Sequence, residues 1–330
     1  MEDLNALSLE DLYRVLSREG WVTRLIELAR DEDLGPSWAL SGGDVTSRAL
    51  VLPTARARGF LVARSGGVVS GLAVVPEVLH AFRVDADFVP ARGVSDGTRV
   101  EPGTTIGTLV GAQRGILSAE RTLLNFLGRL SGIATRTAEF VALAGGGGGG
   151  RRARIYDTRK TTPGLRVLEK YAVRCGGGCM HRLGLYDAAL IKDNHLAGVS
   201  LEDLPRVVER AVKLAKEEAP REGLRFIEVE VDSLAQLKRL LEAGTLAGGG
   251  SGGGVGVVLL DNFGVADVAA AVAARDAAGA KVELEASGGV TRETLPALAA
   301  TGVDRISLGT LTHGATWLDV ALDLEGQVRG

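Results

Sequence analysis

Residues 157–164, DTRKTTPG, combine turn-forming residues with an excess of positive charge. Asp, Pro and Gly are common in turns, and the segment lies between the apolar run ARIY and the helical pattern LRVLEKYAVR. A turn does not need Arg159 and Lys160 side by side. We therefore expect this turn to bind a negatively charged group.

Other cations could join these two. The candidate set is Arg121, Arg159, Lys160, His181, Arg182 and Lys192. Arginine binds a carboxylate through two parallel N–H groups, a geometry that lysine cannot match. Together at one rim, these side chains would fit a small molecule with more than one negative group. The alternatives are an exposed helical position for Arg121, and an ion pair with an interior acid or a Schiff-base role for Lys192.

Acidic side chains end two of the expected strands. Glu230 lies near the end of RFIEVEVD, and Asp261 precedes Asn262 at the end of VGVVLLDN. Carboxylates at such positions can hold ribose hydroxyls, Mg²⁺ or both. Glu228 and Glu283 lie deeper in their strands, so we expect them to form interior ion pairs.

Glycine turns follow the last two expected strands. Ser287, Gly288 and Gly289 precede a helix expected to begin near Thr291, and Gly309 precedes the final helical segment. In parallel α/β barrels the loops after the last two strands often bind phosphate through backbone N–H groups and a helix N-terminus. These turns therefore predict a phosphate site.

The two cysteines, Cys175 and Cys179, lie in CGGGCMH. With His181 they could hold a metal ion, but the spacing is short and no fourth ligand is apparent. Two reduced thiols beside a glycine turn are the favoured interpretation.

Six short apolar runs supply the strands that must position these groups. From residue 153 onward they alternate with helical patterns near 164–174, 200–219, 233–243, 264–278 and 291–301; the runs are ARIYD, AALIKD, RFIEVEVD, VGVVLLDN, KVELEAS and DRISLGT. Such alternation predicts a parallel sheet, either doubly wound or closed into a barrel. Nearly every strand ends in polar residues. A barrel gathers all carboxyl ends into one ring, whereas a doubly wound sheet binds at one switch point. A barrel of six or seven strands is therefore favoured.

The first part of the chain has a different pattern. Residues 8–30 predict one amphipathic helix, 45–110 a small β-rich domain and 118–143 a second helix. A chain of 330 residues is expected to form more than one domain. The tracts 144–152 and 247–254, which contain glycines 145–150 and 248–254, are expected to be solvated linkers without a chemical role.

Composition excludes some classes of protein. The net charge of −3 argues against nucleic-acid binding driven by bulk charge. No run of about 18 apolar residues predicts a membrane span, and the acidic N-terminus lacks a signal-peptide pattern. We expect a cytoplasmic protein that binds neither nucleic acid nor membrane.

The motifs together resemble the quinolinate phosphoribosyltransferase family. They are GDVTS, SAERTLLNFLGRLSGIAT, DTRKTTPGLRVLEKYAVRCGGGCMHRLGLYDAALIKDNH, EVEVDS, LLDNF, EASGGV and GVDRISLGTLTH. The resemblance covers nearly the whole chain. It departs at Cys175, Cys179 and Met180, where other small or polar residues are expected, and at the two glycine tracts.

The resemblance implies the architecture and the reaction. An N-terminal α/β sandwich (1–124), joined by the C-terminal tail (315–330), would precede an incomplete α/β barrel (125–314). The family transfers phosphoribosyl from phosphoribosyl pyrophosphate to quinolinate, with Mg²⁺, and releases pyrophosphate and carbon dioxide in NAD biosynthesis. A homodimer or larger homo-oligomer with shared active sites is implied.

It also implies roles for single residues. Quinolinate would contact Arg159, His181, Arg182 and Lys192, together with Arg121 of the partner subunit. Phosphoribosyl pyrophosphate would contact Lys160, Glu230, Asp261, Asn262, Ser287, Gly288, Gly289 and Gly309, with Glu230 and Asp261 near Mg²⁺, directly or indirectly. Lys160, Lys192, Glu230 and Asp261 would be the catalytic residues.

Three other functions share features with this sequence. A same-fold enzyme for a monocarboxylate such as nicotinate, or a molybdenum-associated paralogue, would need fewer cations in its acid pocket. A Schiff-base aldolase would use Lys192. A biotinyl or lipoyl carrier is excluded because RSGGVVSG has no lysine in its turn.

Overall fold

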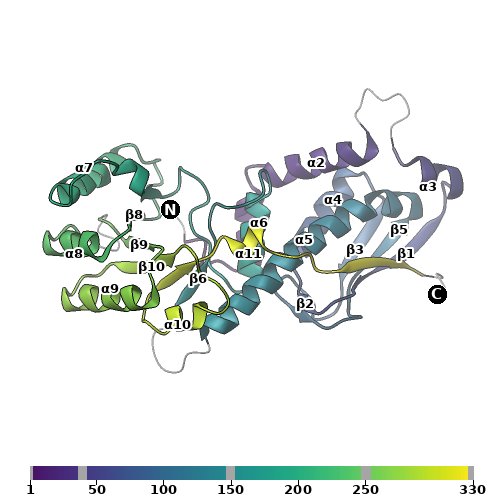
Figure 1. Cartoon of the computed structure of the whole chain (residues 1–330). Coiled ribbons are helices and arrows are strands. Elements are labelled where there is room, and N and C mark those ends of the chain that lie inside the picture. The colour runs from purple at the N-terminus through teal and green to yellow at the C-terminus, as the bar shows by residue number, and fades with distance from the viewer. Residues whose placement is uncertain (1–2, 36–42, 146–152, 247–253, 326–330) are drawn as a thin grey trace. The chain divides into compact units, whose positions relative to one another are not determined.

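The computed structural model describes residues 3–35, 43–145, 153–246 and 254–325. They form two compact units (Figure 1). The barrel unit comprises 3–5, 139–145, 153–160, 178–246 and 254–309, and the N-terminal unit comprises 6–35, 43–138, 161–177 and 310–325. The boundary falls within one long helix, α5 (Gln113–Gly145).

The barrel unit contains a six-stranded parallel sheet. Its strands are β6 (Arg154–Tyr156), β7 (Ala189–Ile191), β8 (Ile227–Val231), β9 (Val257–Asp261), β10 (Glu283–Ser287) and β11 (Arg305–Ser307). Its helices are the 3₁₀ turn η2 (Asp193–His195), α7 (Leu204–Glu217), α8 (Leu234–Glu242), α9 (Val265–Ala277) and α10 (Leu295–Ala299). Figure 1 shows α7, α8 and α9 along one side of the sheet.

The strand order decides between the two expected topologies. The order is β6-β11-β10-β9-β8-β7, so the first strand pairs with the last, and the second strand lies at the far edge. This is the cyclic order of a barrel that is open between its first two strands, whereas a doubly wound sheet reverses direction at an internal switch point. The prediction of an incomplete α/β barrel is confirmed.

The N-terminal unit is built on a four-stranded antiparallel sheet with the order β12-β1-β5-β3. Its strands are β1 (Arg56–Ala63), β3 (Ala86–Pro90), β5 (Thr105–Ala112) and β12 (Val320–Leu324), with a separate pair β2 (Gly67–Val68) and β4 (Arg99–Val100). Its helices, besides part of α5, are α1 (Leu9–Ser17), α2 (Trp21–Leu34), α3 (Val45–Leu50), η1 (Leu72–Val74), α4 (Val75–Ala81), α6 (Arg166–Cys175) and α11 (Thr310–His313). The last strand of the chain, β12, pairs with β1.

A sandwich core forms in this unit. Figure 1 shows α4 and α5 covering one face of the antiparallel sheet. Leu61, Ile106 and Leu109 of the strands are fully buried, as is Leu127 of α5. Burial of such side chains contributes about 1.5–3 kcal/mol each.

One predicted helix is wrong in its extent. Residues 8–30 form two helices rather than one, because Gly20 adopts a left-handed φ of 73° between α1 and α2. That conformation ends a right-handed helix and suits glycine, which lacks a Cβ atom. The glycine tracts lie almost entirely outside the described residues, so the linker prediction for them stays a prediction.

Candidate active site

The carboxyl ends of five neighbouring strands, β7 to β11, meet at one edge of the barrel sheet. The register pairs Asp261 with Ser287 and Ser287 with Ser307, and it places Ile191 beside Val229. Residues that follow these positions therefore emerge together. The predicted strand-end groups share one edge, as a barrel requires.

Lys192 and Glu230 form an ion pair at this edge. The Nζ atom of Lys192 lies 2.5 Å from Oε2 of Glu230. The carboxylate side chain is 6% exposed and the lysine side chain 42%. A Schiff-base lysine must be neutral to attack a carbonyl, so this contact favours a charge-bearing role for Lys192.

Asp261 and Asn262 pack against the glycine turn after β10. The N–H of Asn262 donates to the carbonyl of Ser287 at 2.8 Å, and its side-chain amide donates to Asp261 at 2.8 Å. A Cβ atom on Gly288 would lie 2.2 Å from Oδ1 of Asn262, and Gly288 has a φ of +87°. Only glycine fits here, so the two strand ends approach as closely as backbone allows.

Arg159 and Arg182 place two positive charges near each other. Burial, and next the charge of Arg159, lower the pKa of Arg182, while the charges of Glu228, Asp187 and Glu230 oppose this. Arg182 is itself buried, whereas Lys160 is exposed. Like charges held close to each other are unfavourable unless opposite charges lie near them, and here Glu228, Asp187 and Glu230 supply opposite charge to Arg182.

His181 contacts buried groups that belong to different strands and turns. Its Nε2 atom lies 3.0 Å from Oε2 of Glu228 and 3.4 Å from Oε1 of Glu285, and its Nδ1 atom accepts the N–H of Arg182 at 2.8 Å. Its backbone N–H donates to Oδ1 of Asp157 at 2.9 Å. All of these side chains are buried.

His181, Glu228 and Glu285 shift one another's pKa values. Burial lowers the pKa of His181, but the charges of Glu285 and Glu228 outweigh burial and raise it to about 10. Burial and the charge of Glu285 raise the pKa of Glu228, whereas His181 and Arg305 lower that of Glu285 against its burial. The charges of the two glutamates therefore favour the protonated form of His181.

Two family models match almost the whole chain. "Quinolinate phosphoribosyl transferase, C-terminal domain" matches residues 133–323, and "Quinolinate phosphoribosyl transferase, N-terminal domain" matches residues 44–131. The chain belongs to the quinolinate phosphoribosyltransferase family.

Similar proteins carry the corresponding names. A "Nicotinate-nucleotide pyrophosphorylase [carboxylating]" of Mycobacterium leprae is 44% identical over 286 residues, which cover 86% of this chain and 92% of the relative. A "Probable nicotinate-nucleotide pyrophosphorylase [carboxylating]" of Bacillus subtilis is 38% identical over 89% of this chain and 90% of its own. The solved "nicotinate-nucleotide pyrophosphorylase from Francisella tularensis" is 33% identical with a TM-score of 0.78 and covers 98% of this chain and 100% of its own.

In this quinolinate phosphoribosyltransferase chain, most predicted site residues lie in the barrel unit. Those residues are Arg159, Lys160, His181, Arg182, Lys192, Glu230, Asp261, Asn262, Ser287, Gly288, Gly289 and Gly309. Arg121 lies in α5 within the N-terminal unit and is exposed there. The substrate roles of all these residues stay predictions.

Sequence reasoning missed the partners of His181. Glu228 was expected in an interior ion pair, which is confirmed, but with His181 as its partner rather than a lysine or arginine. Glu283 pairs with Arg154 and Arg305, as expected of an interior acid. In β11, Arg305 and Ser307 alternate with the apolar Ile306. This alternation was the sequence signal that a further cation lies on the polar face of the strand.

The cysteines show no sign of a metal site. Neither forms a disulfide bond, and burial raises the pKa of Cys175 to about 12, which disfavours the thiolate that binds zinc. His181, the third possible ligand, directs Nε2 at two carboxylates.

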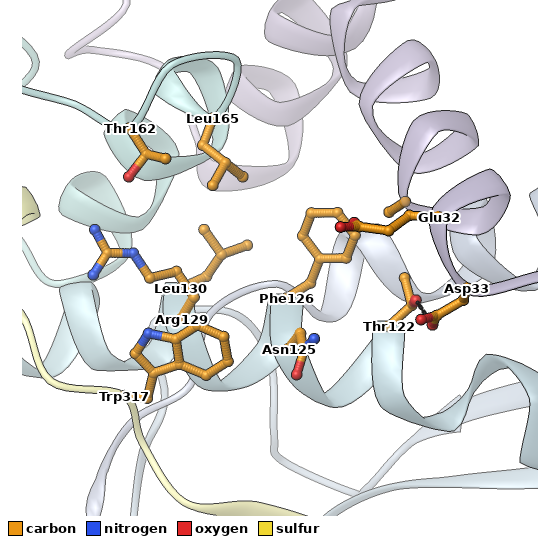
Figure 2. A pocket seen from close by; sticks show the side chains of 11 residues that line it. Glu32, Asp33, Thr122, Asn125, Phe126, Arg129, Leu130, Thr162, Leu165 and Trp317 are labelled. Carbon is orange, nitrogen blue, oxygen red and sulfur yellow. Dashed lines mark hydrogen bonds between the residues drawn. The ribbon is translucent and has the colours of Figure 1, made fainter.

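A separate cavity of about 420 Å³ lies within the N-terminal unit (Figure 2). It is lined by α2, α5, Thr162, Leu165 and Trp317. Its polar lining is largely occupied, since Thr122 donates to Asp33 at 2.7 Å and Arg129 contacts Glu169 at 2.6 Å. It contains none of the predicted site residues. In the part of the chain that the structure describes, no helix is long and apolar enough to cross a membrane.

Proposed function

We propose that this chain transfers the phosphoribosyl group of phosphoribosyl pyrophosphate to quinolinate and releases carbon dioxide. The other products are nicotinate mononucleotide and pyrophosphate. The reaction is a step of NAD biosynthesis. Family membership over nearly the whole chain supports the reaction. The single structural observation that carries it is that the charges of Arg159 and Glu230 both act on the buried Arg182, and we infer that these cations line the pocket for the carboxylates of quinolinate.

The pocket suits a dicarboxylate. Two guanidinium groups can each bind one carboxylate through paired N–H donors. Lys192 adds an ammonium at the same edge, where Glu230 holds it. In the oligomer, Arg121 of the partner subunit would add a further cation. A monocarboxylate would leave part of this charge without a counter-ion.

The opposite side of the edge suits the sugar phosphate. Glu230 and Asp261 would accept the ribose hydroxyls, and the turn Ser287–Gly289 with Gly309 would accept the 5′-phosphate on backbone N–H groups. Lys160 is exposed at the end of β6 and would contact the pyrophosphate.

The carboxylates also fit Mg²⁺. Glu230 and Asp261 provide hard oxygen donors at the ends of neighbouring strands, and Mg²⁺ commonly uses one or two carboxylates together with substrate phosphates. When bound there, the ion would neutralise charge on pyrophosphate. The protein's own contribution on that side is the ammonium groups of Lys160 and Lys192.

The reaction then depends on how the two substrates are oriented more than on proton transfer by the protein. The pyridine nitrogen forms a bond to the anomeric carbon as the bond to pyrophosphate breaks, and positive charge builds on the ribose ring. Glu230 and Asp261 would stabilise that charge. The product ring carries N⁺, so the bond to the adjacent carboxylate can break, leaving its electron pair beside N⁺ and releasing carbon dioxide. A proton from solvent completes the ring.

The proposal includes assembly and location. A homodimer or larger homo-oligomer would complete each site with Arg121 of the partner subunit, and a cytoplasmic location fits substrates of central metabolism.

The direct test supplies quinolinate or nicotinate with phosphoribosyl pyrophosphate and Mg²⁺. We expect quinolinate to release carbon dioxide and form nicotinate mononucleotide, with no reaction of nicotinate. Turnover of nicotinate without carbon dioxide release would instead establish a monocarboxylate enzyme. Borohydride trapping of a carbonyl substrate at Lys192 would establish an aldolase.

A further inference from the structure

The loop 182–188 begins with Arg182, one of the predicted quinolinate ligands, and runs to the start of β7. It contains neither a helix nor a strand. Because such a loop lacks the hydrogen bonds of a helix or a sheet, its backbone N–H and C=O groups need other partners. The groups that hold the loop also determine where the guanidinium of Arg182 lies.

The carboxylate of Asp187 holds this loop from within. Its Oδ2 atom accepts the N–H of Leu183 at 2.8 Å, and its Oδ1 atom accepts the N–H of Gly184 at 2.8 Å. Asp187 is fully buried. Hydrogen bonds from backbone N–H groups to a carboxylate are stronger than those between neutral groups. The two peptide groups that directly follow Arg182 are therefore bound to one buried carboxylate.

The guanidinium of Arg225 connects the two ends of the same loop. Its Nη1 atom lies 3.3 Å from Oδ2 of Asp187 and donates to the carbonyl of His181 at 3.2 Å. The backbone N–H of Arg225 also donates to the carbonyl of Asp187 at 2.8 Å. The side chains of Arg225 and Asp187 are 7% and 1% exposed. The residue before the loop and the residue near its end are therefore tied to one side chain.

Asp187 acts on Arg182 through charge as well as through the backbone. Burial, the largest cause, lowers the pKa of Arg182, and the charge of Asp187 is among those that raise it. The Nη1 atom of Arg182 also donates to the carbonyl of Ala188 at 3.4 Å, at the far end of the loop. By its charge alone, a carboxylate near Arg182 would oppose the binding of a dicarboxylate. Its hydrogen bonds to the loop would have the opposite effect if they place Arg182 correctly.

We propose that Asp187 and Arg225 are positioning residues for the reaction, because they hold the loop 182–188 in the conformation that places the guanidinium of Arg182 against quinolinate. The inference rests on the proposed function, in which Arg182 binds a carboxylate of that substrate. The alternative is an ion pair that only stabilises the barrel unit and leaves the quinolinate pocket unaffected.

The first experiment measures quinolinate binding to full-length Asp187→Asn by calorimetry. The substitution keeps the shape of the side chain but removes its charge and one of its two acceptor oxygens. We expect quinolinate to bind roughly tenfold more weakly, because Arg182 is no longer held. Affinity for phosphoribosyl pyrophosphate should change less than about twofold. Loss of the negative charge alone would strengthen quinolinate binding, so an unchanged or tighter affinity would overturn the proposal.

The matched control is Asp304→Asn in the same unit. Asp304 is also buried, pairs with the buried Arg275 and accepts the N–H of Leu284 at 2.9 Å. Neither of these partners lies in the loop 182–188. We expect Asp304→Asn to lower the melting temperature and to leave quinolinate affinity within about twofold of wild type. A loss of quinolinate affinity equal to that of Asp187→Asn would indicate general damage and contradict the proposal.

A double-mutant cycle tests whether Asp187 acts through Arg182. We expect Asp187→Asn combined with Arg182→Ala to bind quinolinate no more weakly than Arg182→Ala alone. Effects that multiply would show that Asp187 acts by another route. Arg225→Lys keeps the positive charge but lacks the planar fork, so it should weaken quinolinate binding in the same direction and by less. Wild-type affinity in Arg225→Lys, together with an Asp187→Asn that fails to fold, would also overturn the proposal.

Hydrogen exchange reports on the loop without any substrate. In peptides that cover the loop, measured by mass spectrometry, the amides of Leu183 and Gly184 should exchange slowly in wild type and at least about tenfold faster in Asp187→Asn. Fast exchange in wild type would show that the loop is not held and would overturn the inference. If the wild-type chain binds no quinolinate, the proposed function fails and the role of the loop in binding fails with it. Slow exchange that is lost in Asp187→Asn would then still establish Asp187 as the group that holds the loop.

Discussion

At the scale of single residues, the most informative feature is an unfavourable one. Burial, and next the nearby charge of Arg159, lower the pKa of Arg182. Two like charges near each other are unfavourable by themselves. Their proximity is explained when a ligand with two negative groups completes the cluster.

Replacement of Arg159 tests whether this side chain binds a carboxylate of quinolinate. Arg159→Ala removes a charge-assisted pair of hydrogen bonds worth about 3 kcal/mol, so kcat/KM for quinolinate should fall roughly 100-fold or more. The matched control is Arg206→Ala, whose side chain is 74% exposed and forms an ion pair with Asp203. Steady-state kinetics with varied quinolinate measures both. Full activity of Arg159→Ala would refute the assignment.

The raised pKa of His181 predicts how stability depends on pH. Because the folded-state value is about 10 and the ordinary value is 6.5, the folded protein binds a proton more tightly than the unfolded chain. This contribution to stability is complete below about pH 6.5 and is lost as pH rises through about 10. Between pH 7 and 10, the melting temperature should fall more steeply with rising pH in the wild type than in His181→Asn. If the melting temperatures of the two proteins changed in parallel with pH, the raised pKa of His181 would be disproved.

Part of this residue-level picture was predictable from sequence. The strand-end acids and cations could be chosen because a parallel barrel brings strand ends together. The contacts of His181 could not, because Glu228 and Glu285 are 47 and 104 residues away along the chain from it (228 − 181 and 285 − 181). Only strand register decides which of many acids faces which cation.

At the scale of elements, hydrophobic periodicity predicted all six barrel strands and the helices between them. It did not predict the helix break at Gly20, because the apolar stripe continues on both sides of this residue, whose backbone is left-handed. Periodicity reports which face is buried and does not report a break that preserves that face. The predicted helix near 291–301 was likewise longer than α10, which begins at Leu295.

The turn after β10 gives a prediction at this scale. Gly288→Ala places a Cβ atom against the side chain of Asn262 and imposes a left-handed φ that costs about 1–2 kcal/mol. We expect KM for phosphoribosyl pyrophosphate to rise several-fold, with a smaller change in KM for quinolinate. Gly279→Ala is the control, because Gly279 has a φ of +62° but open space around its Cβ position.

The two variants separate strain from site damage. Gly279→Ala should lower the melting temperature through backbone strain and leave both KM values unchanged. If Gly288→Ala shows the same pattern, the turn after β10 does not bind the sugar phosphate.

At the scale of the whole molecule, the proposed sharing of Arg121 between subunits has a quantitative consequence. Arg121→Ala and Arg159→Ala should each be inactive. In a dimer that mixes them, one of the two sites has both native arginines. Random exchange in an equal mixture yields mixed dimers as half of the total, so about a quarter of wild-type activity should return.

The measurement is activity after mixing under conditions that allow subunit exchange, with light scattering to establish the oligomeric state. Each variant taken alone through the same treatment is the control. A mixture that stays inactive although subunits exchange would place Arg121 in the site of its own subunit or outside it.

The sequence by itself determined the residue types at the strand ends, the α/β alternation and the family. These follow from local patterns, because turn chemistry, apolar periodicity and short motifs are written in neighbouring residues. The tertiary structure decided the open barrel order, the close approach of Gly288 to Asn262, and the buried contacts of His181. Those depend on register between strands distant in sequence, and register is set by packing of the whole sheet rather than by any single segment.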